Sequence, residues 1–152
     1  MMFRELMAAF GEKIGLAEPI EIDEDGFCSF DVGDATVAMQ GVDEIETLSL
    51  SADVGTPPPE NLETLYRELL QANDNFRGTN GATLSLDPRT GSVRLCRYAP
   101  YSALDADRLS ELVLGFIEAL ANWRLRVRDF RADASFASAD APAQGLDGFL
   151  QV

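Results

Sequence analysis

The sequence contains no histidine, and this removes the side chain that most often acts as a general base near neutral pH or as a metal ligand. Only two cysteines occur, Cys28 and Cys96, and without a CxxC pair neither a redox dithiol nor a zinc site is indicated. We expect two core thiols in a reducing cytoplasm. The sequence also lacks a G-x-S-x-G motif and a glycine-rich phosphate loop. These absences predict that the protein is not an enzyme and uses no cofactor.

Long apolar runs are missing as well, and we find neither a signal-peptide core nor a segment of transmembrane length. Basic residues are scarce: 12 Lys and Arg face 26 Asp and Glu, which gives a formal charge of −14. Such a field repels phosphate backbones and anionic membranes and attracts basic segments, although it can also serve only to keep a protein soluble. We expect a soluble cytoplasmic protein that binds neither nucleic acid nor membrane.

Three acidic stretches are candidates for functional sites. Glu21, Asp23, Asp25 and Gly26 match the start of a calcium-binding loop, but its twelfth position is Val32 and strand patterns flank it, which favours an acidic turn. The stretches "DEIE" (43–46) and "DAD" (105–107) show no sign of the burial that acid–base chemistry needs. We interpret the first stretch as an acidic turn and the other two as solvated acidic faces.

The apolar spacing predicts the secondary structure. Residues 3–14 have helical periodicity and end at Gly15, and residues 61–75 form a second helical pattern. Between them lie strand-like runs at 19–22, 27–32, 35–40 and 45–52, the last of which is stopped by three prolines. On the strand 27–32, Cys28, Phe30 and Val32 share one side and Phe27 lies on the other.

Residues 83–98 predict a hairpin around the turn "DPRTG", in which Asp87 accepts a backbone hydrogen bond and Gly91 takes the left-handed conformation. A long helix follows from the cap Asp105, and Arg124, Arg126 and Arg128 suit its carboxyl end. The order α-β-β-β-(β)-α-β-β-α predicts an α+β fold with a twisted antiparallel sheet and three helices. We expect one domain over residues 1–128.

Residues 129–152 form an Ala/Asp-rich tail with little periodicity. A frayed terminus is the simple interpretation. The alternative is that Leu146, Phe149 and Leu150 dock on an apolar groove of the same or a neighbouring chain.

The hairpin "LSLDPRTGSVRLCRYAP" (84–100), followed by a helix ending "LGFIEALANWR" (114–124), resembles the class I chaperones of bacterial type III secretion, the Tir-chaperone or CesT-like family. This resemblance covers about residues 1–128. It implies a homodimer in the cytoplasm of a Gram-negative bacterium that binds the N-terminal segment of a secreted effector and keeps it soluble and export-competent, without nucleotide. The alternative is a stand-alone YbjN-like regulatory or stress-related domain of the same topology with no secretion role.

The resemblance also suggests where partners bind. We expect the effector groove on the first helix and adjoining strands, at Phe3, Leu6, Met7, Phe10, Ile14, Phe27, Phe30 and Val37. Phe3, Met7 and Phe27 are the members that we predict to be exposed; the alternative is that the helical stripe is only core. The dimer contact is expected at Leu62, Tyr66, Leu69, Leu70, Arg94 and Cys96.

Overall fold

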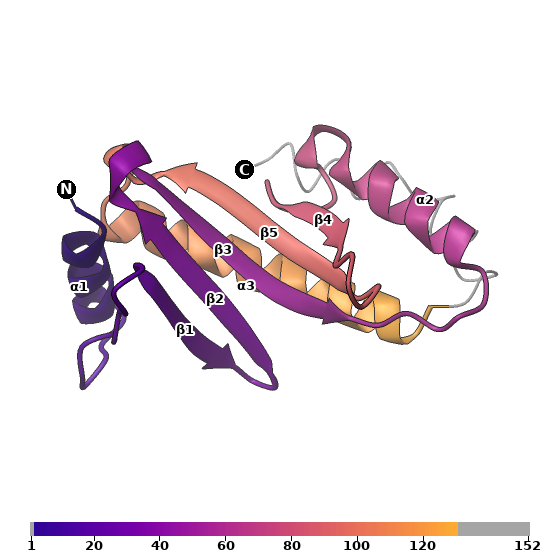
Figure 1. Cartoon of the computed structure of the whole chain (residues 1–152), viewed down its shortest axis with the longest axis horizontal. Coiled ribbons are helices and arrows are strands. Elements are labelled where there is room, and N and C mark those ends of the chain that lie inside the picture. Colours follow the sequence, from indigo (N-terminus) through magenta and orange to yellow (C-terminus); the bar gives the residue numbers. More distant parts are fainter. Residues whose placement is uncertain (1, 131–152) are drawn as a thin grey trace. The chain divides into compact units, whose positions relative to one another are not determined.

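The computed structural model describes residues 2–130. Its elements, in chain order, are α1 (Phe3–Lys13), β1 (Phe27–Val32), β2 (Ala35–Val42), η1 (Asp43–Ile45), β3 (Thr47–Gly55), α2 (Leu62–Asn73), η2 (Asp74–Phe76), β4 (Thr83–Leu86), β5 (Val93–Pro100), η3 (Tyr101–Ala103) and α3 (Ala106–Arg128) (Figure 1). The strands form one five-stranded antiparallel sheet in the order β1-β2-β3-β5-β4. The predicted α+β fold with three helices is confirmed.

The predicted strand at 19–22 is wrong, because this segment has no strand partner and packs through side chains instead. The Arg4 guanidinium donates to the carbonyls of Ile22 and Asp23, at 3.1 and 2.6 Å. The acidic turn that follows is held by the Asp23 carboxylate, which accepts the backbone N–H groups of Asp25 and Phe27 at 2.9 Å. β3 begins later than predicted, because η1 occupies residues 43–45 and Glu46 has a φ of +48°.

The described chain separates into two compact units. One contains residues 2–52 and 97–117, and the other contains residues 53–96 and 118–130. We call them the N-unit and the C-unit. The domain boundary at residue 128 stays a prediction, although Phe130 just beyond it is buried in the C-unit. The predictions for the tail, a frayed terminus or docking of Leu146, Phe149 and Leu150, concern residues outside the described range.

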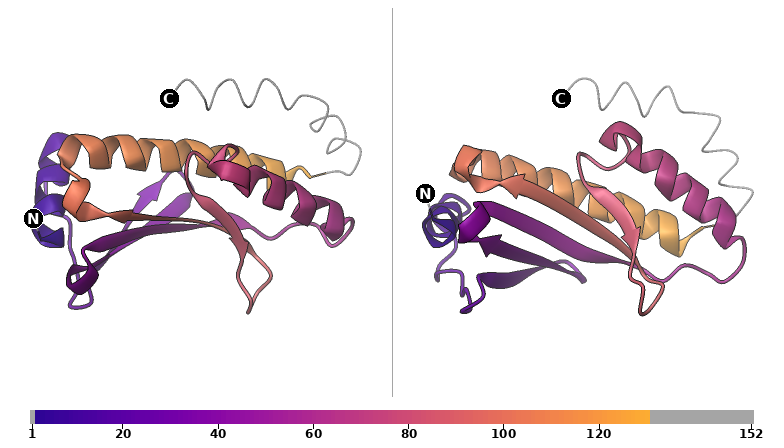
Figure 2. Two further views of the ribbon diagram at one scale, coloured as in Figure 1. Left: turned by 90° about the horizontal axis from the view of Figure 1, so that it is seen from above. Right: turned by 45° about the horizontal axis from the view of Figure 1, so that its top comes forward.

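Strand alternation builds the core of the N-unit. In β1, β2 and β3, one side of each strand is the more covered, and the residues of the other side are exposed or half-buried. The covered set is Cys28, Val37, Met39, Leu48, Leu50 and Ala52. Helix α1 lies across the beginning of α3 (Figure 2), where the Lys13 ammonium pairs with Asp107 at 2.5 Å. Each fully buried aliphatic side chain contributes about 1.5–3 kcal/mol to folding through the hydrophobic effect.

The amino end of α1 is fixed to the sheet at one point. Gly41 lacks a side chain, and a Cβ built there would lie 2.1 Å from the Phe3 ring, so the ring packs directly on the β2 backbone. Asp43 then accepts the Phe3 backbone N–H at 3.0 Å and a hydrogen bond from the Tyr101 hydroxyl. This carboxylate caps the positive end of a helix that is remote in sequence. The expectation that "DEIE" is only a solvated face is therefore wrong at Asp43, which is half-buried.

The C-unit is organised around two side chains of α3. The Arg126 guanidinium makes a two-point ion pair with Glu68 of α2, at 2.6 and 2.8 Å, and lies over the Phe130 ring at 5.4 Å from its centroid. The Trp123 indole N–H donates to the carbonyl of Gly78 at 2.8 Å. These contacts hold the middle of α2 and the loop after η2 against the carboxyl half of α3, with Leu65 and Leu69 buried.

The Asp43 cap predicts a pH-dependent stability. The Tyr101 hydroxyl, followed by the Phe3 N–H, lowers the pKa of Asp43 below its usual value. A lowered folded-state pKa stabilises the fold above the unfolded pKa of about 3.9, and this contribution is lost as pH falls through the folded value. Asp43→Asn should therefore be less stable than the parent protein by a constant amount above about pH 5, and the difference should shrink below about pH 4.

Urea unfolding from about pH 3 to about pH 8 measures this difference. Glu44→Gln, an exposed change in the same turn, is the control and should alter stability little at any pH. A difference between Asp43→Asn and the parent that does not vary with pH would contradict the assignment.

Candidate functional site

Most of the predicted groove residues are core. Phe3, Leu6, Met7 and Phe10 of α1 are buried within the N-unit, as is Val37 of β2. The prediction that Phe3 and Met7 are exposed is therefore wrong. At Phe3 the physical reason is Gly41, whose missing side chain lets the ring pack directly on the β2 backbone.

A smaller set of apolar side chains does reach the surface of the N-unit. Phe27 is 41% exposed, as predicted, and lies on the open side of β1 with Ser29 and Asp31. Ile14 follows the end of α1 and is 48% exposed. Phe30 and Val32 lie on the covered side of β1 but remain half-buried, because β1 is an edge strand. A role of these residues in partner binding stays a prediction.

The outer edge of β1 offers unused hydrogen-bonding groups. The backbone N–H and C=O of Phe27 point away from β2, because they bond to the Asp23 carboxylate and to the Asp23 N–H. Strand alternation then directs the N–H and C=O groups of Ser29 and Asp31 to the same edge. Among residues 2–130, no strand pairs with this edge. It is therefore a template for a further strand.

The opposite edge of the sheet is blocked. The Asn73 side-chain amide of α2 donates to the carbonyl of Leu84 at 2.9 Å and accepts its backbone N–H at 2.8 Å. The Asn73 side chain thus forms the two hydrogen bonds that an adjacent strand would otherwise form with the backbone of Leu84. β4 has only four residues, so this pair of bonds covers much of its edge.

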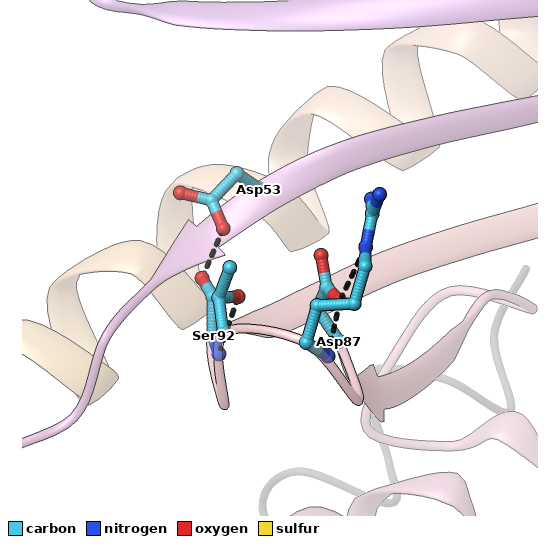
Figure 3. Close-up of polar contacts among 5 residues, drawn as sticks. Asp53, Asp87 and Ser92 are labelled. Atoms are coloured by element: carbon cyan, nitrogen blue, oxygen red, sulfur yellow. Dashed lines mark hydrogen bonds and ion pairs between the residues drawn. The ribbon is translucent and has the colours of Figure 1, made fainter.

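The residues that carry the family resemblance shape a turn and do not form a reactive group. The Asp87 carbonyl accepts the Gly91 N–H at 2.8 Å, its carboxylate accepts the Arg89 N–H at 2.9 Å, and Gly91 has a φ of +73°. That backbone hydrogen bond from Arg89 is the main reason that the pKa of Asp87 is lowered. Figure 3 shows this turn, together with the Ser92 hydroxyl donating to Asp53 on β3.

The predicted dimer residues form two groups in the C-unit. On α2, Leu70 is 70% exposed and Leu62 and Tyr66 are half-buried, whereas Leu69 points into the core. On the other side of β5 from the buried Val93 and Leu95 lie Arg94 and Cys96, both half-buried. A dimer contact at these residues stays a prediction, and the buried Leu69 is not available for one in this structure.

The described residues contain little reactive chemistry. The two thiols are free, and burial, with a smaller effect of Asp23, raises the pKa of Cys28 to about 11. Within residues 2–130, no group of three or more Cys, Asp and Glu side chains is arranged to hold a metal ion. In the same range, none of the helices is both long and apolar enough to cross a membrane.

Comparison with models of known protein families shows which family the chain belongs to. The model of the Tir chaperone protein (CesT) family matches residues 5–124, and the chain therefore belongs to this family. No curated protein matches the sequence. The match ends before the tail, so the tail is an addition to the part that defines the family.

Solved structures share the fold at low identity. A chain of the HopA1–SchA chaperone–effector complex has a TM-score of 0.67 and 20% identity, covering 80% of this chain and 92% of that one. A chain of the ExsC–ExsE complex has a TM-score of 0.68 and 22% identity, covering 82% and 92%. A chain of the complex between the Yersinia pestis type III secretion chaperone SycH and a fragment of YscM2 has a TM-score of 0.66 and 17% identity, covering 80% and 99%.

The amide of Asn73 gives a stability prediction. Asn73→Ala leaves the backbone N–H and C=O of Leu84, a buried residue, without these partners, and should lower the free energy of unfolding by about 1–3 kcal/mol. Gln71→Ala, at an exposed site on the same helix, should cost less than about 0.5 kcal/mol. Urea denaturation of both variants measures the two effects, and equal losses would show that the amide contributes nothing specific.

Proposed function

We propose that this chain is a cytoplasmic, homodimeric chaperone that binds the N-terminal segment of a type III secreted effector and keeps it soluble and export-competent. The observation that carries the proposal is the family match over residues 5–124, combined with an unpaired sheet edge beside exposed apolar side chains. No nucleotide or other cofactor takes part. A binding role also suits a structure in which the residues of the hairpin that carries the family resemblance stabilise a turn and form no reactive group.

The effector segment binds along β1 as an added strand. Its backbone pairs with Ser29 and Asp31, and its side chains on one face cover the half-buried Phe30 and Val32. Phe27 extends the contact on the other face. Edge pairing needs only an extended backbone on the partner, so it suits a segment that must stay unfolded for export.

Dimerisation uses α2 and β5. Leu70 exposes 70% of its surface on a helix whose neighbouring Tyr66 and Leu62 are only half-covered. Burying such a stripe against a second copy removes apolar surface from water and needs no further change in the subunit.

Phe27→Asp tests the function together with the site. Because Phe27 is exposed, the variant should fold normally, which circular dichroism measures, and it should lose most effector binding in a pull-down. Met39→Asp is the contrasting variant, since Met39 is fully buried and a charge there should unfold the protein. The parent chain, purified from its native host, should bring down one secreted protein through its N-terminal segment.

A parent chain that repeatedly captures no secreted protein would instead favour the YbjN-like alternative. A folded Phe27→Asp chain that binds effector normally would place the contact away from the open side of β1.

Leu70→Asp tests the dimer. The parent protein should be a dimer at micromolar concentration by light scattering, and the variant should be a folded monomer with a dissociation constant raised at least about tenfold, because a charge would be buried at the contact. Leu125→Asp, at an exposed leucine of α3, is the control and should stay dimeric. A monomeric parent protein would refute this part of the proposal.

A further inference from the structure

Negative charge is concentrated in one of the two units. The N-unit contains 15 acidic and four basic side chains, a net charge of −11. The C-unit contains eight acidic and seven basic side chains, a net charge of −1. If the negative charge served only to keep the protein soluble, we would expect it on both units and not on the N-unit alone.

The strands of the N-unit lie in a stretch without any cation. Residues 14–66 contain 13 Asp and Glu and no Lys or Arg, and this range includes all of β1, β2 and β3. The four cations of the N-unit lie outside this stretch, and three of them have partners in their own unit: Arg4 donates to backbone carbonyls, Lys13 pairs with Asp107, and Arg108 donates to the Ala103 carbonyl at 2.9 Å. β1 itself therefore carries two carboxylate-bearing neighbours in sequence and one of its own, Asp31, and no cation.

The free edge of β1 has two unlike faces. A strand paired along it would meet the half-buried Phe30 and Val32 on one face. On the other face it would meet Ser29 and the exposed carboxylate of Asp31, whose only described side-chain bond is the 2.8 Å hydrogen bond from the Thr36 hydroxyl. Facing side chains on neighbouring strands interact directly, and opposite charges there are favourable.

From this arrangement we propose that the segment recognised by β1 is a strand of alternating apolar and basic residues. Its apolar side chains cover Phe30 and Val32, and its Lys or Arg side chains lie beside Asp31 in the negative field of the N-unit. This inference rests on the β1 site of the proposed function and adds the chemical class of the partner segment. It excludes an acidic or uncharged strand as the preferred ligand.

Fluorescence-labelled peptides of about eight residues, within the usual range of strand lengths, test the inference. One alternates Val with Lys, one alternates Val with Glu, and one places the same Val and Lys residues in two blocks. At about 50 mM NaCl the alternating Lys peptide should bind at least tenfold more tightly than either of the others, because only it matches both faces. Raising NaCl to about 500 mM should weaken its binding several-fold.

Charge reversal locates the effect. Asp31→Lys should lower the affinity for the alternating Lys peptide about three- to tenfold, since it removes one attraction and adds a repulsion. Glu118→Lys changes the net charge equally at an exposed site on α3 and should lower it less than twofold. Amide hydrogen exchange should slow at Ser29 and Asp31 when this peptide binds to the parent chain.

Equal binding of the Lys and Glu peptides would overturn the inference, and so would equal effects of the two charge reversals or protection of amides away from β1. None of these results would prevent the parent chain from capturing a secreted protein in its host, so the proposed function would stand. Failure of that capture, with the peptide preference intact, would overturn the function and leave the charge inference in place.

Discussion

The arrangement of the N-unit depends on one steric constraint, the packing of the Phe3 ring on the bare backbone at Gly41. Any side chain at position 41 would occupy the space of the ring, so the close approach of α1 to β2 requires glycine there. Once the ring is seated, Asp43 reaches the amino end of α1 and the Tyr101 hydroxyl. The apolar stripe of α1 is thereby used up as core, and the surface left for other molecules is on the strands.

The sequence predicted the element order well because most elements have local causes. The hairpin around Asp87 and Gly91 forms through bonds between residues only a few positions apart, and the prolines after β3 end it by removing donors. Two of the errors, at residues 19–22 and at Asp43, had non-local causes. Residues 19–22 have a strand-like pattern but no strand to pair with, and Asp43 appears solvated in "DEIE" until Tyr101, 58 positions away, is placed beside it.

The candidate site was harder to predict for a related reason. Helical spacing identifies a stripe on α1 but does not say whether it covers a core or a groove, and the packing of α1 on the rest of the N-unit, beginning with Phe3 at Gly41, decides this. The free edge of β1 has no side-chain pattern, since it consists of backbone groups that become available when the strand order is known. The signal that sequence reasoning did contain was the apolar Phe27 among polar neighbours on the outer side of a strand.

The side-chain amide at Asn73 has a consequence for how the protein behaves at high concentration. A sheet with two free edges can grow from both, so each added molecule presents a new edge to the next and the array has no natural end. Because Asn73 occupies the β4 edge at Leu84, a second molecule can add to the sheet only at β1. If two molecules pair through their β1 edges, neither has a free edge left at that strand. The amide thus limits edge-to-edge pairing to one partner for each chain, and it leaves β1 as the edge that can accept a passenger segment.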